Sequence, residues 1–248
     1  MVIKTNPGSL AVVQSESVGE PPHFKRIFIC LQACAHGFMQ GCRGIVGLDG
    51  CHLKGPFGGI MLGAVSLDAN LQFFPLAYAI VEVEDKDSWA WFLTMLRDGV
   101  GENLDVRPWV LISDRQKGLI KAAGEVLPEC THRMCCHHIL QNWQKMYKVP
   151  GLKDMFWEAA NATNVYEFRL AMDKIRAENE AAYGWLTQLE TRSWALHAMD
   201  SRVKCEHITS NFVESWNAWI GEERYKPPIT MLENIRSKIM DLIYNRGQ

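Results

Sequence analysis

Two short apolar segments, each ending at an aspartate, limit how this chain can fold more than any other feature. They are Gly44-Ile-Val-Gly-Leu-Asp49 and Trp109-Val-Leu-Ile-Ser-Asp114. Both are short for helices, and an apolar run of this length is typical of a strand buried on both faces of a sheet. We therefore expect two interior strands that end in Asp49 and Asp114.

Further strands and helices are predicted around these two segments. Residues 58–68 and 73–83 have strand composition, with 68–71 as the hairpin loop between them. Helix-like spacing of apolar residues predicts a helix over 24–40. The other predictions are a short edge strand at 12–13, a helix from Asp87 or Ser88 to Gly99, a helix at 116–126, a strand at 131–134 and helices at 136–147, 211–220 and 231–244.

This order of elements indicates the fold class. Three meander strands are followed by helix, strand, helix, strand and helix, which is the order of an α/β, RNase H-like mixed sheet flanked by helices. Residues 150–199 have helical spacing throughout and predict an all-helical insertion before the last helices of the chain. The expected divisions are an irregular segment 1–24, a core 25–149 with both aspartates, the insertion 150–205 and C-terminal helices 206–248.

Composition narrows the class of protein. Hydrophobic residues make up 48% of the 248 residues and charged residues 22%, which is typical of a globular protein with a core. No apolar run approaches the roughly 20 residues of a membrane span, and we expect no secretory signal and reduced cysteines. The net charge of −2 lacks the basic excess of a dedicated DNA-binding domain, so contact with nucleic acid is expected only at a local site.

The paired aspartates predict metal chemistry. Phosphodiester cleavage and strand transfer use two divalent cations, and Mg²⁺ prefers carboxylate oxygens. If the two strands are parallel neighbours, Asp49 and Asp114 converge at one edge of the sheet, where a cation would offset their repulsion. The alternative is structural: either aspartate can stabilise a turn, and Asp114 can cap the following helix.

Four ordered motifs resemble a known family, the plant Mutator-like (MULE) transposases. They are Gly47-Leu-Asp-Gly-Cys-His-Leu-Lys-Gly55, Val110-Leu-Ile-Ser-Asp-Arg-Gln-Lys-Gly-Leu119, His132-Arg-Met-Cys-Cys-His-His138 and Thr209-Ser-Asn-Phe-Val-Glu-Ser-Trp-Asn217. The first two look like the family's two aspartate motifs, the third like its His-Arg-x-Cys-x-x-His signature and the fourth like its late Asn-x-x-Glu-Ser-x-Asn element. The resemblance covers about residues 25–245.

The resemblance implies a DDE-type nuclease and DNA strand transferase. Asp49 and Asp114 carry over as ligands of Mg²⁺ or Mn²⁺, and Glu214 as the third acid, with Glu158 and Glu206 as rivals. The implied partner is DNA, at transposon ends and target, in the nucleus. A homo-oligomer is possible, and neither a membrane nor a small-molecule substrate is expected.

Cys135 and His138 lie three residues apart, on one face of a predicted helix. They form half of a possible Zn²⁺ site, but a structural zinc normally needs four ligands. The favoured interpretation is therefore a packed cysteine and a hydrogen-bonded histidine that brace the edge of the site. Possible completing ligands are Cys130, His132, His137, Cys205 and His207.

Charged side chains flank the predicted acids. Lys54, Arg115, Lys117 and Arg133 are candidates for contacts to DNA phosphates, although each can equally be a solvated side chain near a turn. Glu82, Glu84, Asp85 and Asp87 follow the third strand and are expected to form a solvated acidic loop.

Three functions compete. The first is a transposase catalytic domain, expected to be a truncated copy because the family's N-terminal zinc-containing DNA-binding domain and SWIM zinc finger are not found in the sequence. The second is a domesticated, non-catalytic nuclear regulator of the far-red-impaired-response type. The third is a zinc-braced interaction domain built around Cys135.

Overall fold

The protein is described by a computed structural model that covers residues 2–16, 21–101, 109–203 and 205–246. Its centre is one sheet, in which the described strands follow the order β1-β2-β5-β4-β3-β6-β7. The strands are β1 Leu10–Glu16, β2 His23–Cys30, β3 Ile45–His52, β4 Ile60–Leu67, β5 Phe73–Val81, β6 Val110–Ser113 and β7 Thr131–Met134. The pairs from β1 to β3 are antiparallel, and β3, β6 and β7 run parallel.

This mixed sheet confirms the predicted RNase H-like α/β class. The interior strands are apolar because helices cover both faces, so every residue of β4 and β6 is buried. The hairpin between β4 and β5 and the strand β7 are found as predicted. Strand β3, in contrast, does not end at Asp49 but continues to His52, because it keeps pairing with β4 as far as Ile60.

The predicted helix over residues 24–40 is wrong in its first half. That half is strand β2, and helix α2 Gln32–Gly41 begins only after Leu31. Aromatic and β-branched residues such as Phe28 and Ile29 favour a strand, and pairing with both β1 and β5 stabilises it. The N-terminal segment is therefore not irregular: apart from residues 1 and 17–20, which lie outside the described residues, it contributes helix α1 Val2–Thr5 and strand β1 to the sheet.

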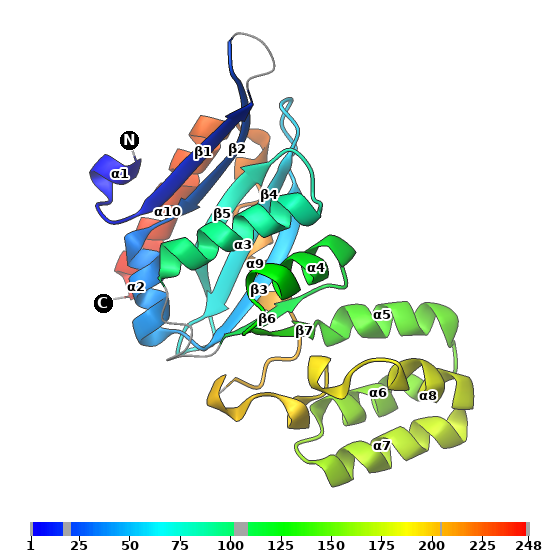
Figure 1. The fold of residues 1–248 in the computed structure, drawn as a ribbon. Coiled ribbons are helices and arrows are strands. Elements are labelled where there is room, and N and C mark those ends of the chain that lie inside the picture. The colour runs from blue at the N-terminus through cyan, green and yellow to red at the C-terminus, as the bar shows by residue number, and fades with distance from the viewer. Residues whose placement is uncertain (1, 17–20, 102–108, 204, 247–248) are drawn as a thin grey trace.

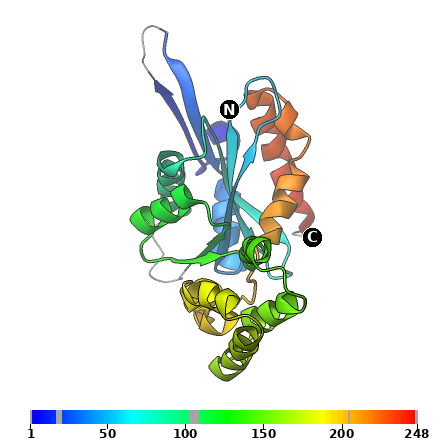
Figure 2. The ribbon, with the colours of Figure 1, turned by 90° about the vertical axis from the view of Figure 1, so that its right-hand side faces the viewer.

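Helices cover the two faces of the sheet (Figures 1 and 2). Helices α3 Lys86–Val100 and α4 Lys117–Val126 lie on one face. Helices α9 Asn211–Trp219 and α10 Pro228–Arg246, drawn in orange and red, lie on the other, linked by a short 3-10 turn at Glu223–Tyr225. The N-cap of α3 is Asp85, whose side chain accepts from the Ser88 amide, and not Asp87 or Ser88 as predicted.

A second group of helices projects from one end of the sheet (Figure 1). Its buried residues form a hydrophobic core separate from that of the sheet, around Trp143, Phe156 and Trp194. The helices are α5 Cys136–Met146, α6 Leu152–Asn161, α7 Val165–Glu178 and α8 Glu180–Thr187, followed by 3-10 turns at Thr191–Ser193, Leu196–Ala198 and Ser201–Val203.

Arg133 of β7 joins this helical group to the sheet. Its side chain is 1% exposed, and its guanidinium donates hydrogen bonds to the carbonyls of Arg192, Trp194 and Ala195. A buried cation needs such partners, because desolvation without them is costly. None of the described helices is both long and apolar enough to cross a membrane.

Candidate functional site

Asp49 and Asp114 lie at the same level on neighbouring parallel strands. Strands β3 and β6 pair from Ile45 with Val110 to Gly47 with Ile112, and the same offset places Asp49 beside Asp114. The parallel arrangement required by the sequence prediction is therefore present. It brings both side chains to the carboxyl end of β6, where the two charges interact.

Asp49 is held in a setting that disfavours its charge. Burial, followed by the charge of Asp114, raises its pKa from 3.8 to about 6. Two hydrogen bonds act to lower this pKa: one from the Gly50 backbone, and one from Nδ2 of Asn217, on α9, which donates to Oδ2 of Asp49 at 2.7 Å. A carboxyl group with this pKa changes charge near neutral pH and gains from a nearby cation.

Asp114 forms the turn between β6 and α4 but does not cap the helix. Its Oδ1 accepts from the Gln116 amide at 2.9 Å, while Oε1 of Gln116 accepts from the Leu119 amide and is the N-cap. Ser113, just before it, contacts Nε2 of His132 at 2.8 Å. Burial lowers the pKa of His132 to about 4, so this histidine is neutral and braces the turn.

Glu84 is a third carboxylate at the site that the sequence did not single out. It follows β5 and lies against Gly50, where a Cβ atom would come within 2.8 Å of the Glu84 Cδ atom. Burial and the charge of Asp114 raise its pKa, against a hydrogen bond from Nε1 of Trp89 at 3.3 Å. Its charge in turn contributes to the raised pKa of Asp49. The interpretation of this segment as a solvated loop is therefore wrong for Glu84.

If Glu84 contributes to cation binding, Glu84→Gln is expected to weaken Mg²⁺ affinity about tenfold, a loss of about 1.4 kcal/mol. Isothermal titration calorimetry measures it. Asp87→Asn is the matched control, because Asp87 is an exposed acid in the first turn of α3. Equal affinity in wild type and Glu84→Gln would remove Glu84 from the site.

Glu214 lies on the first turn of α9 and is exposed. Asn217 is three residues further along, so the helix face that reaches Asp49 also carries Glu214. The charges of Asp114 and Glu214 both contribute to the raised pKa of His138, so both acids lie within electrostatic range of this histidine. The rivals lie elsewhere: Glu158 pairs with Lys174 on the helical group, and Glu206 lines a separate cavity.

Cys135 and His138 are brought together at the start of α5. Burial acts to raise the pKa of the Cys135 thiol, but hydrogen bonds involving His138 and Ser210 outweigh it and leave the pKa below its usual value. The same contact with Cys135 is the main cause of a raised pKa at His138. Both shifts favour a charged pair over two neutral side chains.

The four predicted phosphate-contacting residues differ in accessibility. Lys54 is exposed, with Nζ over the Tyr225 ring at 5.2 Å, and Lys117 is exposed at the start of α4. Arg115 is half-buried, and its guanidinium lies 5.3 Å from the ring centre of Trp185 on α8. Arg133 is buried on main-chain carbonyls, so we leave it out of the DNA-contacting set.

The donor set fits a hard divalent cation in chemistry. Asp49, Asp114 and Glu84 offer carboxylate oxygens, and the repulsion at Asp49 is what a cation would relieve. Within the part of the chain that the structure describes, however, no three His, Cys, Asp or Glu side chains are grouped closely enough to hold one ion. Binding would therefore draw the side chains together, and Cys135 and His138 have no third ligand among the described residues.

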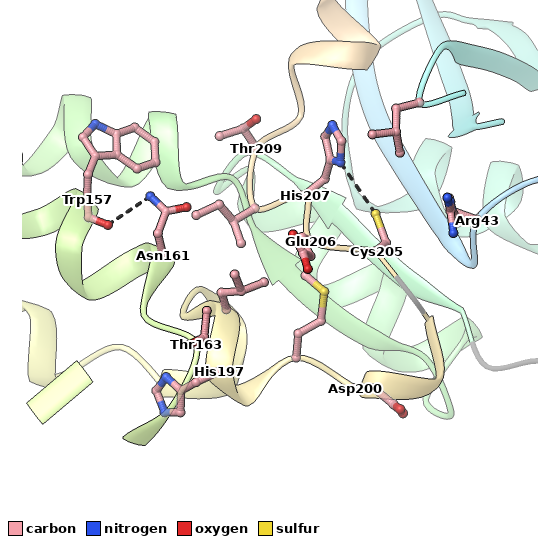
Figure 3. Close-up of a pocket in the computed structure, with 14 residues that line it drawn as sticks. Arg43, Trp157, Asn161, Thr163, His197, Asp200, Cys205, Glu206, His207 and Thr209 are labelled. Atoms are coloured by element: carbon pink, nitrogen blue, oxygen red, sulfur yellow. Dashed lines mark hydrogen bonds between the residues drawn. The ribbon is translucent and has the colours of Figure 1, made fainter. Parts of the chain in front are cut away.

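A cavity of about 920 Å³ has none of the three predicted acids among its lining residues (Figure 3). Residues 205–209 form one wall, and Trp157 and Asn161 of α6 lie across from them. Within it, Sγ of Cys205 is 3.8 Å from Nδ1 of His207. Burial raises the pKa of Cys205 and lowers that of His207, so both are neutral at physiological pH.

The fold and the site together define a class: an RNase H-like domain with acidic side chains at the same level of two central parallel strands, Asp49 within β3 and Asp114 just after β6. Residues 45–142 match the model of the MULE transposase domain family, which supports a Mutator-like transposase domain over this part of the chain. The match runs from β3 into α5; it includes Asp49, Asp114, Cys135 and His138, and Glu214 lies beyond it. Comparison with curated proteins finds no match. The function is therefore transposase-related, and a transposase domain implies interaction with DNA.

Proposed function

We propose that this domain catalyses metal-dependent phosphodiester hydrolysis and DNA strand transfer, with Asp49, Asp114 and Glu214 as the acidic residues. The observation that carries the proposal is the raised pKa of Asp49, which is buried beside Asp114 on a parallel strand. The electrostatic cost of this pair in the folded protein has no structural use that we identify, whereas a cation would offset it. Function on DNA implies a nuclear location.

Glu84 and Glu214 have different roles in this proposal. Glu84 is in electrostatic contact with both aspartates and supplements them from the α3 side of the sheet. Glu214 approaches from α9, on the opposite face, and is exposed. Because it is exposed, Glu214 is free to change rotamer and complete the ligand set when a cation and DNA bind.

Two divalent cations, Mg²⁺ or Mn²⁺, would supply charge stabilisation to the attacking and leaving oxygens of the phosphodiester. The protein's own contribution is to orient the carboxylates. Asn217 donates to Oδ2 of Asp49, and the Gln116 amide donates to Oδ1 of Asp114, so both carboxylates are held in a defined orientation. Lys54 and Lys117 are the exposed cations available to the DNA backbone near this edge.

A nicking assay on supercoiled DNA tests the activity. We expect Mg²⁺-dependent nicking that falls at least roughly 100-fold in Asp114→Asn, because even outer-sphere changes at metal sites cost 10–100-fold. Glu158→Gln is the control, since Glu158 is an acid of the same kind paired with Lys174 on the surface of the helical group. Equal nicking by wild type and Asp114→Asn would rule out this role for Asp114.

Contact of Lys54 and Lys117 with phosphates predicts a specific salt dependence. Each substitution by glutamine should reduce the slope of log K against log salt for duplex DNA by about 0.9. Binding is measured by fluorescence anisotropy between 50 and 200 mM salt, a range chosen because counterion release dominates there. Lys153→Gln, on the exposed side of α6, should keep the wild-type slope. An unchanged slope in Lys54→Gln and Lys117→Gln would mean that DNA binds elsewhere.

A non-catalytic, DNA-associated regulatory role is the second candidate. The absence of a closely grouped set of three ligands among the described residues favours it. In that case the protein binds DNA with the same affinity with and without Mg²⁺, and Asp114→Asn leaves DNA binding unchanged. The catalytic proposal instead predicts that Mg²⁺ strengthens DNA binding by the wild type and has no such effect on Asp114→Asn.

A further inference from the structure

Cys135 connects two elements that carry predicted acids. It is fully buried, and its amide donates to the carbonyl of Ser113 at 2.7 Å, one residue before Asp114. Its Sγ accepts from the Ser210 amide at 3.3 Å, one residue before α9. One residue therefore links the end of β6, through its backbone amide, to the beginning of α9, through its thiol.

The segment that leads into α9 is held at a second point. The Cys136 amide donates to the Ile208 carbonyl at 2.9 Å, next to the contact between Cys135 and Ser210. The Ser210 carbonyl then accepts from the amides of Val213 and Glu214, which begins the first turn of α9. Glu214 therefore lies one helical turn from Ser210, the residue whose amide Cys135 binds.

His138 completes this arrangement. Its Nδ1 is buried, and its interaction with the thiol of Cys135 is the main cause of its raised pKa. Asp114 and Glu214 also act on it. The pair of Cys205 and His207 differs in the direction of its pKa shifts, since burial favours the neutral form of both side chains.

We propose that Cys135 is a positioning residue: its thiol fixes the start of α9 against the end of β6 and thereby sets the separation of Glu214 from Asp114. The inference rests on the proposed function, because that separation matters only if both acids bind one cluster of cations. A buried amide that loses its acceptor is costly, so the Ser210 amide, in a residue 4% exposed, depends on this sulfur.

Three variants of the full chain test the proposal. Cys135→Ala removes the acceptor, and Cys135→Ser restores a shorter one and remains informative if the alanine variant does not fold. Cys136→Ala is the matched control: Cys136 is equally buried, but its Sγ contacts the Trp194 carbonyl in the helical group.

Two measurements are made on each variant. In the absence of metal, amide hydrogen exchange at Ser210 should be roughly tenfold faster in Cys135→Ala, intermediate in Cys135→Ser and unchanged in Cys136→Ala. Mn²⁺ affinity should follow the same order, with a loss of roughly tenfold in Cys135→Ala. A purely structural role would lower stability without separating Cys135→Ala from Cys136→Ala in Mn²⁺ affinity.

Three results would overturn the proposal: unchanged exchange at Ser210 in Cys135→Ala, equal effects in Cys136→Ala, or wild-type Mn²⁺ affinity in Cys135→Ala. These failures leave the proposed function intact, because the wild type still binds Mn²⁺. Absence of Mn²⁺ binding by the wild type contradicts the proposed function instead, and with it any positioning role for Cys135.

Discussion

Asp49→Asn is expected to stabilise the metal-free protein while it abolishes metal-dependent nicking. Asparagine keeps an oxygen that can accept from Asn217 but carries no charge for Asp114 to repel. The folded-state pKa of Asp49 is about 6 against a usual value of 3.8, so the folded protein holds the proton more tightly than the unfolded chain. Deprotonation therefore costs stability, up to about 3 kcal/mol.

The raised pKa of Asp49 in the folded state determines how stability depends on pH. Below about pH 3.8 the carboxyl is protonated in both states and the penalty vanishes; it grows as the pH rises towards 6 and is complete above it. At pH 7.5 without metal, thermal denaturation should show a melting temperature up to roughly 6–12 °C higher in Asp49→Asn, since 1 kcal/mol shifts it by roughly 2–4 °C in a protein of this size. The difference should shrink towards pH 4, and Mg²⁺ should raise the melting temperature of the wild type alone. A lower melting temperature for Asp49→Asn at pH 7.5 would mean that Asp49 is a structural residue.

Gly47→Ala is the second substitution with a large expected effect. Gly47 lies in β3 two residues before Asp49, and α9 packs directly on it. A Cβ atom there would lie 2.2 Å from Cγ2 of Val213 and 2.6 Å from the ring of Phe212. Neither is the end of a flexible side chain, so α9 must move away from the sheet.

We expect Gly47→Ala to reduce the free energy of unfolding by about 3 kcal/mol, the upper part of the range for overpacked cores. Displacement of α9 should also break the hydrogen bond between Asn217 and Asp49. Urea denaturation measures the stability, with Gly41→Ala as the control, because a Cβ at Gly41 meets nothing within 4 Å. A loss below about 0.5 kcal/mol in Gly47→Ala, the usual range for surface sites, would show that α9 does not pack closely on β3.

The sequence was sufficient for features that depend on local pattern. The apolar runs before Asp49 and Asp114 indicated interior strands, and β6 is buried throughout. The strand β2 was missed because Ile27, Leu31, Cys34 and Phe38 also fit helical spacing, and only pairing with β5 decides between the two. Short amphipathic segments allow both interpretations until their partners are known.

Features of the site that depend on distant contacts could not be predicted in this way. Glu84 lies in a run of acidic residues, and such a run is usually solvated. Its actual position depends on Gly50, because a side chain larger than hydrogen there would collide with the Glu84 carboxylate. Arg133 was taken for a surface cation because the carbonyls that it binds lie about 60 residues later. Asn217 belonged to a quoted motif, but only the folded protein shows its bond to Asp49.

A crystal structure determined with Mn²⁺ tests the central claim most directly, because anomalous scattering locates the ion without reference to activity. The account predicts an anomalous peak coordinated by the carboxylates of Asp49 and Asp114, with Glu84 or Glu214 drawn in to complete the set. Mn²⁺ bound only at other sites, with the side chains of Asp49 and Asp114 unchanged and free of metal, would contradict it.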